Sequence, residues 1–584
     1  MKLIFRYLGR YKKWVALAIV IKLLATLMEL TIPYVLEHII DDVVPTGDLV
    51  RVLMWGLVMF IAAVLTRTIN VKANTTAIRN AHRVSYDVRQ ELFAKTSELS
   101  GSQFDSFGLP SLISRMTSDS YNVQSSVQML QTMCVRAPIM LIGGVFVSMT
   151  MDAQLAMIMV VMLPLLLGIT IFVSLKGMPM FKKVQEKLDS VVRIMRENIT
   201  GVRVVKALSK AEYEKRRFAS ANEDMARSDI AAATVMAIPG PFMQLCLNTG
   251  LALVVIIGAQ RVNAGEMKPG VILAFLTYFN MITMGVMGVS RIFVMVSRAG
   301  ASADRIDAVI RTSTDQRILS ADEALKPSGD EFIRFEHVDF SYGEGGADRS
   351  GFVGQEREKA LSDISFAIRR GESLGIIGPT GCGKTTVINL LMRFYDADGG
   401  GVFVDGRDVR SYDKDELRRK FGATFQNDMV FQDTLRENVV FGREVSEERL
   451  RRAVEDAQAA EFIDAIEGGL EHEAAIKGAD LSGGQKQRLL VARALAADPE
   501  ILVLDDASSA LDYKTDAAMR RAIAADHPDS TVIMIAQRVS SVMNMSKILV
   551  LDDGKCIGYG THEQLLESCE AYRETYEVQM GALV

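Results

Sequence analysis

Apolar residues gather in long runs in the first half of the chain and in short runs in the second half. A helix that crosses a membrane needs about 20 mostly apolar residues, and the pattern before residue 300 predicts six such helices. They are expected at about residues 14–40, 50–72, 127–151, 153–175, 232–260 and 269–292. Residues 1–312 are therefore predicted to form an α-helical membrane domain with six spans.

The loops between these spans differ in length and charge. Short, acidic or sparsely charged loops join spans one and two, three and four, and five and six, whereas about fifty residues separate the others. The two long stretches are charged and lack Pro- or Gly-rich breaks, so we expect helices that continue well beyond the bilayer. Lysine and arginine gather before the first span and in the long loops. The positive-inside rule then places both termini and both long loops in the cytoplasm.

Some of the predicted spans contain ionisable residues, among them Lys22, Glu29 and Arg136. Lys22 and Glu29 are seven positions apart and so share one face of a helix. Charge at membrane depth is costly and often faces a cavity or pathway, so these two residues are candidate cavity residues. The alternative is that Lys22 and Arg136 snorkel or pair inside the bundle. The abundant methionines are more typical of packing, although a plastic, methionine-rich cavity is compatible with them.

Beyond the membrane domain the pattern changes. Residues 313–330 are polar and include Pro327 and Gly329, so they are predicted to be a linker. From residue 331 to residue 584, short β-like runs alternate with helical patterns. Such alternation is typical of an α/β domain.

One tract of this α/β domain has the pattern of a phosphate-binding P-loop, GxxxxGK[ST]. A buried strand is predicted at residues 373–377, directly before the loop, and a helical stretch follows it. The loop sequence is Gly378-Pro379-Thr380-Gly381-Cys382-Gly383-Lys384-Thr385. Glycines let backbone N–H groups surround phosphates, and the helix N-terminus adds positive potential. Lys384 is placed to reach the β- and γ-phosphates, and Thr385 to offer a hydroxyl to Mg²⁺.

Two further tracts fit the same chemistry. The apolar run 501–505 is predicted to be a strand, and it ends in Asp505, a carboxylate placed to hold Mg²⁺ through water. A second candidate anion site lies sixteen residues before that strand, where a Ser-Gly-Gly opens a strongly helical stretch. The tract is Leu481-Ser482-Gly483-Gly484-Gln485.

Composition excludes several classes of protein. The length of 584 residues suggests two to four structural units, and a mean hydropathy of +0.17 excludes a disordered chain. A net charge of −5 and a pI near 5.9 disfavour nucleic-acid binding. The five scattered cysteines form no CxxC pair, so neither a disulfide framework nor a zinc site is indicated. We expect no signal peptide and no peptidase domain before the first span.

The tracts LSGGQKQR, VARAL and ILVLDDASSALD resemble the nucleotide-binding domain of ATP-binding cassette (ABC) transporters. Six spans before one cassette resemble a half-transporter of the exporter type, and the likeness extends over nearly the whole chain. The fold expected from it is a six-span helical membrane domain with long cytoplasmic helical extensions, fused to an α/β P-loop cassette. ATP and Mg²⁺ are the implied ligands.

The resemblance also implies roles for individual residues. Tyr342 resembles the aromatic residue that stacks on adenine, and Gln426 resembles the Q-loop glutamine that binds Mg²⁺ together with Thr385 and Asp505. The implied ATP-binding residues are Tyr342, Gly378, Pro379, Thr380, Gly381, Cys382, Gly383, Lys384, Thr385, Thr386 and Gln426. The implied D-loop is Ser509, Ala510, Leu511 and Asp512. Residues 107–115 and 197–206 fall where the family has its two coupling helices. Two cassettes of the family pair head to tail, with each ATP between one P-loop and the other cassette's LSGGQ.

Two positions depart from the family's pattern for hydrolysis. The family's general base is a glutamate after the strand-ending aspartate, and this chain has Asp506 there. The family's switch residue is a histidine, and this chain has Gln537. Aspartate is one methylene shorter, and a displacement of about 1 Å can slow catalysis on the order of 10²-fold. Glutamine can donate a hydrogen bond but cannot carry a proton as histidine can. In addition, Ala475-Ile476-Lys477-Gly478 lacks the usual acidic residue before the signature.

An intact LSGGQ beside a degenerate catalytic pair suggests one half of an asymmetric pair. The chain would bind ATP at its own weakly hydrolytic site, and its Ser482 and Gly484 would complete a partner's hydrolytic site. We expect a multi-pass exporter subunit of a bacterial plasma membrane, with a second half-transporter and the bilayer as partners and no nucleic acid. The alternatives are a homodimer with slow turnover, an importer of exporter-like fold and an ATP-gated regulatory subunit. Lipids, drugs and small peptides are all compatible as substrates.

Overall fold

The computed structural model describes residues 1–343, 359–426 and 428–581, and these form two compact units. The first unit comprises Met1–Thr96 and Leu112–Thr312. The second comprises Ser97–Ser111 and Ser313–Val584. A short segment of the first half of the chain therefore folds with the second half.

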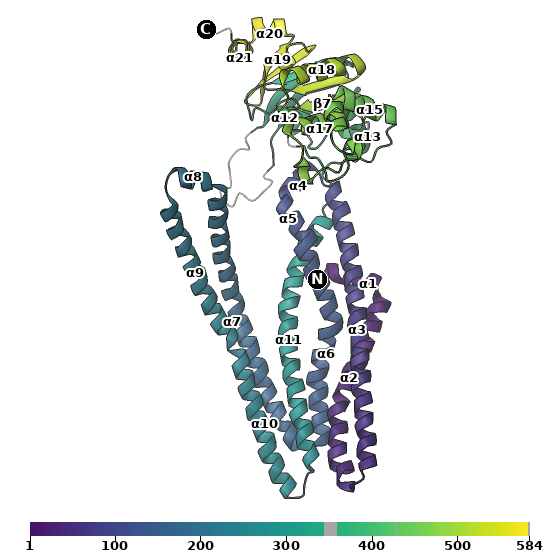
Figure 1. Cartoon of the computed structure of the whole chain (residues 1–584), viewed down its shortest axis with the longest axis vertical. Helices are drawn as coiled ribbons and strands as arrows, with labels where there is room; N and C mark the ends of the chain where they lie inside the picture. Colours follow the sequence, from purple (N-terminus) through teal and green to yellow (C-terminus); the bar gives the residue numbers. More distant parts are fainter. Residues whose placement is uncertain (344–358, 427, 582–584) are drawn as a thin grey trace. The chain divides into compact units, whose positions relative to one another are not determined.

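The first unit is built of long helices. Its described residues contain 6 helical stretches that are long and apolar enough to cross a membrane, which confirms the six predicted spans (Figure 1). The stretches are Lys12–Thr46, Leu49–Glu98, Leu109–Met151, Ala153–Thr200, Ala211–Asn263 and Pro269–Ile310. Two of them contain single helices of 50 and 48 residues. Each of these helices is longer than a span requires and so includes a predicted extension beyond the bilayer.

The helix bounds show where proline interrupts the pattern. The helices are α1 Lys2–Arg10, α2 Lys12–His38, α3 Leu49–Glu98, α5 Leu109–Ser114, α6 Ser120–Met151, α7 Ala153–Thr200, α8 Val202–Ala207, α9 Ala211–Ala237, α10 Pro239–Asn263 and α11 Pro269–Ile310. Short π- or 3₁₀-helical turns cover Ile39–Val43, Val44–Thr46 and Arg115–Asp119. Pro239 is the first residue of α10 and lies inside the predicted fifth span. Because proline lacks an N–H, it is favoured at a helix start, although the long helices α2, α6 and α7 also hold prolines in their interiors.

The helices of the first unit pack through a shared apolar core. Helix α6 packs against α2 and α11, and α7 packs against α9. Figure 1 shows α8 at the tip of the hairpin formed by α7 and α9. Tyr278 of α11 is buried in this core, and its hydroxyl donates to the carbonyl of Leu30 on α2 at 2.7 Å. Gly250 allows α10 to approach α11, since a Cβ there would lie 2.2 Å from the Phe279 ring.

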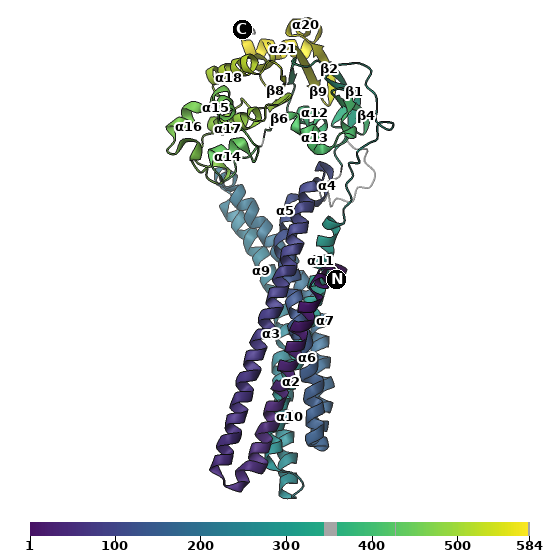
Figure 2. The same ribbon diagram turned by 90° about the vertical axis from the view of Figure 1, so that its right-hand side faces the viewer.

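The second unit contains two sheets and their covering helices (Figure 2). One is a 6-stranded sheet in the order β10-β9-β3-β8-β7-β6, in which only β10 runs antiparallel to its neighbour. The other is a 4-stranded antiparallel sheet in the order β2-β1-β4-β5. Strands β3 and β7 are almost entirely buried, as their apolar sequences predict. The predicted α/β domain is therefore confirmed.

The strands are β1 Ile333–Phe340, β2 Leu361–Ile368, β3 Ser373–Ile377, β4 Gly399–Val404, β5 Arg407–Asp408, β6 Phe421–Thr424, β7 Ile501–Asp505, β8 Thr531–Ile535, β9 Lys547–Asp552 and β10 Lys555–Gly560. The helices are α4 Gly101–Phe107, α12 Lys384–Leu391, α13 Lys414–Arg419, α14 Leu435–Val440, α15 Glu447–Asp456, α16 Ala460–Ala465, α17 Gly483–Leu495, α18 Tyr513–Asp526, α19 Val539–Val542, α20 His562–Ser568 and α21 Glu570–Met580. Short 3₁₀ turns cover Val409–Ser411, Gly469–Glu471 and Ile476–Gly478.

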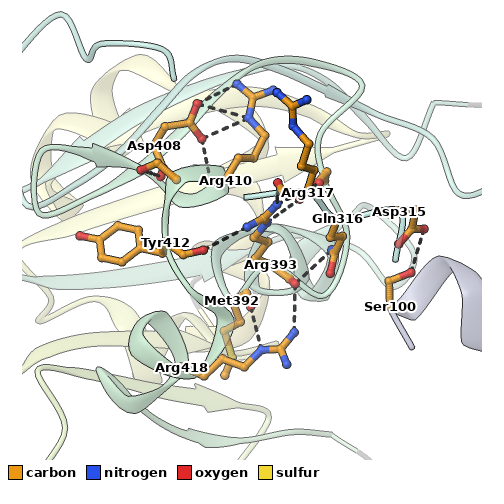
Figure 3. A network of polar contacts seen from close by, with 12 residues as sticks. Ser100, Asp315, Gln316, Arg317, Met392, Arg393, Asp408, Arg410, Tyr412 and Arg418 are labelled. Atoms are coloured by element: carbon orange, nitrogen blue, oxygen red, sulfur yellow. Dashed lines mark hydrogen bonds and ion pairs between the residues drawn. The ribbon is translucent and has the colours of Figure 1, made fainter. Parts of the chain in front are cut away.

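Residues 313–330, predicted to be a linker, are hydrogen-bonded to the α/β domain. The buried side chain of Arg393 donates to the carbonyl of Arg317 at 2.7 Å (Figure 3). It also pairs with Asp396 at 2.9 Å. Its own carbonyl accepts from Gln316 at 3.3 Å. These bonds neutralise and satisfy a buried guanidinium that would otherwise be costly. The segment is polar because it binds the domain through hydrogen bonds.

Helix α4 is attached to the same domain. Ser100 caps it and donates to Asp315 at 2.9 Å (Figure 3). The amide of Gly101 donates to the carbonyl of Phe394 at 3.0 Å, and the Tyr395 hydroxyl donates to Asp105 at 2.6 Å. The sequence places a coupling helix at residues 107–115, whereas the residues that contact the α/β domain here precede that range.

Candidate functional site

The P-loop joins a buried strand to a helix, as its sequence predicts. Strand β3 lies between β8 and β9, and α12 begins at Lys384, directly after the loop. Gly383 has a φ of 97°, and a Cβ there would lie 2.8 Å from the carbonyl of Ala360. A Cβ at Gly378 would lie 2.1 Å from the carbonyl of Leu551. Both positions therefore require glycine, and the loop can keep its backbone N–H groups open to phosphate oxygens.

A cavity of about 530 Å³ lies over this loop. It brings together residues from the P-loop, the ends of β6, β7 and β8, and the turn between β9 and β10. The predicted residues that line it are Tyr342, Thr380, Gly381, Gly383, Lys384, Thr385, Thr386, Gln426, Asp505, Asp506 and Gln537. The lining residues that the sequence analysis missed are Lys359, Ala360, Ile535, Asp553 and Gly554. Ligands commonly bind at such strand ends in α/β sheets.

Three predicted loop residues, Gly378, Pro379 and Cys382, do not line the cavity but lie next to residues that do. The ammonium of Lys384 donates to the carbonyl of Gly378 at 2.8 Å and to that of Pro379 at 2.7 Å. Cys382 is buried in the core between the sheets. The Lys384 ammonium is thus held over the loop, where it can form an ion pair with the phosphates of a nucleotide.

Two carboxylates and a hydroxyl meet at the end of β7. The Thr385 hydroxyl donates to Asp505 at 2.9 Å, and Gln426 lines the same cavity. Burial raises the pKa of Asp505, and the neighbouring charge of Asp506 adds to this, while the Thr385 hydrogen bond opposes it. Hard oxygen ligands of this kind suit Mg²⁺, which is bound through few protein groups and several waters. The donor set therefore fits that ion.

Tyr342 belongs to an aromatic group at the cavity edge. Its ring meets Phe340 and Tyr395 edge-on, at centroid distances of 4.9 and 5.2 Å. The hydroxyl of Tyr342 is 3.0 Å from that of Thr386. The ring is thereby held in place while part of it stays exposed, so it can stack on a planar base.

Asp506 and Gln537 both line the cavity. Asp506 has a φ of 53°, an uncommon conformation for a residue with a side chain. Burial raises the pKa of its carboxyl, although a hydrogen bond with Ser509 lowers it.

The signature tract forms the start of α17 and does not line this cavity among the residues described. Ser482 and Gln485 form a reciprocal capping box, in which the Gln485 amide donates to the Ser482 hydroxyl at 3.3 Å. Gln487, one turn further on, donates to the Ser509 hydroxyl at 2.8 Å and accepts from the Ala510 amide at 2.9 Å. The signature helix and the predicted D-loop are therefore bonded to each other.

The C-terminal helix α21 holds the loop that carries Gln537. Gln579 accepts from the Val539 amide at 2.7 Å and donates to the Gln537 carbonyl at 2.9 Å. Replacing Gln579 by alanine is expected to speed hydrogen exchange at the Val539 amide about fivefold, since the lost bond to that amide is worth about 1 kcal/mol. Hydrogen-exchange mass spectrometry of the peptide with residues 536–542 measures this effect. Gln579→Glu keeps the acceptor for Val539 and should protect that amide. Unchanged exchange in the alanine variant would contradict the prediction.

Comparison with known proteins identifies the family. Residues 15–286 match the ABC transporter transmembrane region, and residues 361–509 match the ABC transporter family. The chain is also 33% identical over 577 residues to the uncharacterized ABC transporter ATP-binding protein YfiB of Bacillus subtilis, covering 98% of each. The chain belongs to the ABC transporters.

Other relatives agree with this assignment. This ABC transporter is 33% identical over 497 residues to the ATP-dependent lipid A-core flippase of Desulfotalea psychrophila, covering 84% of each chain. Its fold is similar to that of a bacterial Atm1-family ABC exporter with ATP bound, with a TM-score of 0.76, 22% identity and coverage of 97% and 98%. It is a multi-pass membrane protein with the architecture of an exporter half-transporter. It binds ATP and couples ATP hydrolysis to transport, and its half size implies a membrane partner or a dimer.

Proposed function

We propose that this ABC transporter is one half of a heterodimeric exporter. It binds ATP at its own degenerate site and supplies its LSGGQ to the partner's hydrolytic site. One observation carries this proposal: Asp506 and Gln537 lie in the P-loop cavity while the intact, capped signature lies outside it. An intact signature is of use only to a second cassette.

In this proposal the cavity residues that the sequence predicts have roles in binding ATP. Lys384 and the P-loop amides bind the phosphates, and Tyr342 stacks on adenine. Thr385, Gln426 and Asp505 hold Mg²⁺, which supplies positive charge beside the β- and γ-phosphates. Asp506 and Gln537 hold the nucleotide without efficient proton transfer, because glutamine does not titrate and the aspartate is too short.

ATP binding would then bias the membrane domain between two states. Closure of paired cassettes moves the groups attached to them, and α4 is attached to Phe394 and Tyr395 by hydrogen bonds. The second short helix, α8, would face the partner's cassette. We propose a bacterial plasma membrane as the location, with both termini in the cytoplasm. An amphipathic substrate is supported by the flippase relative.

Isolation of the assembled transporter tests the heterodimer. The chain would be tagged in its native membrane, purified gently and analysed by mass spectrometry for partners. A stoichiometric second half-transporter with glutamate and histidine at the two degenerate positions is the expected result. Recovery of this chain alone, as a dimer, would contradict the proposal and leave two Asp506 sites to perform all hydrolysis.

Replacing Asp506 by asparagine is expected to lower ATP turnover of the assembled transporter only a few-fold. The same substitution of the glutamate that follows the partner's strand-ending aspartate should abolish turnover, because a correctly placed general base contributes about 10²- to 10⁴-fold. Steady-state phosphate release from the two variants measures the difference. Equal and complete loss in both variants would rule out an asymmetric pair.

A further inference from the structure

The helical unit contains a second cavity, of about 280 Å³. It lies between helices α2, α3, α6 and α11, all of which contain predicted spans. Its lining residues are Lys22, Glu29, Asn74, Thr132, Met133, Arg136, Ala137, Met140, Met281, Met284, Gly285 and Gly288. The two candidate cavity residues of the sequence analysis therefore line one cavity, together with Arg136.

The charges in this cavity do not balance. The guanidinium of Arg136 pairs with Glu29 at 2.8 Å. Lys22 is 4% exposed, and its ammonium donates only to neutral groups among the described residues, at 2.7 Å to Asn70 and 3.0 Å to Asn74. The three ionisable lining residues thus carry two positive charges and one negative charge. The excess positive charge is costly inside a bilayer unless an anion neutralises it.

The cavity also offers hydrogen-bonding capacity. Two buried atoms of the Arg136–Glu29 pair, Nε of Arg136 and Oε2 of Glu29, have no hydrogen-bond partner among the residues described. The Arg136 side chain is 40% exposed, so its remaining guanidinium donors can be reached. Guanidinium groups bind phosphate and carboxylate through paired N–H donors. An acidic group is therefore the chemistry that this cavity would recognise.

The rest of the wall is apolar and adaptable. Four methionines line the cavity, at Met133, Met140, Met281 and Met284. Methionine is flexible and can fit apolar chains of different shape. Gly288 lets α11 approach α6, because a Cβ there would lie 2.9 Å from the Cβ of Ala137. The wall suits an alkyl chain beside the charged groups.

We propose that this cavity binds an anionic amphiphile, with its acidic headgroup at Lys22 and Arg136 and its apolar chain against the methionines. The inference rests on the proposed transport function and names the class of substrate. A cationic amphiphile fits poorly, because the charge of Glu29 is already neutralised by Arg136 through one oxygen and its other oxygen is buried. A further positive charge would increase the imbalance.

Binding to the full-length transporter, purified with its partner and placed in phosphatidylcholine nanodiscs, tests this inference. Radiolabelled dodecyl phosphate is the probe, and labelled dodecyltrimethylammonium is its charge-reversed counterpart. Retention above that of empty nanodiscs gives the specific binding. We expect saturable binding of dodecyl phosphate, weakened at least about tenfold in Lys22→Met and in Arg136→Met, the loss expected for one hydrogen bond to a charged group.

Two control variants separate charge from structure. Lys72 lies on α3 and is exposed, so Lys72→Met removes a lysine without changing the cavity and should bind normally. Lys22→Arg keeps the charge and should retain most binding even if Lys22→Met folds poorly. Stronger retention of dodecyltrimethylammonium, or undiminished dodecyl phosphate binding in both charge-removing variants, would overturn the inference. Equal competition by inorganic phosphate would also overturn it, since the apolar wall would then contribute nothing.

The outcome also separates this inference from the proposed function. If the transporter hydrolyses ATP with its partner but fails to bind dodecyl phosphate, only the substrate class is wrong. If no partner is found, the heterodimer is wrong whatever binds in the cavity.

Discussion

Replacing Ser482 by alanine is expected to lower ATP turnover of the assembled transporter on the order of 10²-fold, the effect of removing one preorganised donor from a reacting charge. ATP binding at this chain's own P-loop should persist, because Ser482 does not line that cavity among the described residues. Phosphate release measures turnover, and a fluorescent ATP analogue measures binding. The split between lost turnover and retained binding would show that the signature acts on another cassette's nucleotide.

The control for this variant is a serine with the same local role. Ser446 caps α15 and accepts from the Arg449 amide at 3.3 Å, as Ser482 accepts from Gln485. Loss of either cap should destabilise a helix by about 1 kcal/mol. Ser446→Ala should therefore match Ser482→Ala in thermal stability and keep normal turnover. Equal loss of turnover in both variants would mean that helix capping, and not nucleotide contact, explains the result.

Replacing Lys384 by alanine is expected to weaken ATP binding at this site about 100-fold, which corresponds to about 2.7 kcal/mol. The reason is the loss of charge-assisted hydrogen bonds to phosphate from an ammonium held over the P-loop. Titration with a fluorescent ATP analogue measures the change. The partner's own site would be blocked by substituting its P-loop lysine.

Lys359 provides the matched comparison, because it lines the same cavity but pairs with Asp339 at 3.1 Å. Lys359→Ala removes the same charge and should weaken ATP binding less than about tenfold, as expected for an exposed, paired cation. Comparable weakening by both substitutions would mean that the net charge of the cavity, and not the P-loop geometry, governs binding.

Much of the fold follows from local patterns. Apolar runs of about twenty residues predict spans because the thickness of the bilayer sets the length of a spanning helix. In the predicted fifth span, 232–260, Pro239 begins a new helix, so α9 and α10 meet inside that range. Helix α4 could have been placed from its capping box, since Ser100 and Gln103 stand in the S-x-x-Q spacing. Its attachment to Phe394 could not, because nothing local to α4 specifies a partner nearly three hundred positions away.

The functional site likewise contains residues that local sequence predicts and residues that only the fold brings together. The P-loop is found from sequence because phosphate binding needs fixed residue types at fixed spacing, and Asp505 is found from the buried strand that it ends. Gln426 is found only from the resemblance to ABC cassettes. Lys359 and Asp553 line the cavity without belonging to such a motif, so only the fold brings them there. Glu29 shares a helix face with Lys22, but the structure pairs it with Arg136 of another helix. Seven residues along a helix span about 10 Å, too far for direct contact.

The hydrogen bonds that attach α4 and residues 313–330 to the α/β domain have consequences for folding during synthesis and for the design of shorter fragments. Ser100 is synthesised 215 residues before Asp315, its hydrogen-bond partner. Helix α4 therefore cannot make its contacts with the α/β domain until the intervening helices have been synthesised and inserted into the membrane. A soluble fragment that starts at residue 331 would remove Gln316 and Arg317. The Arg393 guanidinium and carbonyl would each lose one partner while keeping Asp396 and Arg418, and each lost hydrogen bond is worth about 0.5–1.5 kcal/mol. Fragments for expression should therefore begin near residue 313.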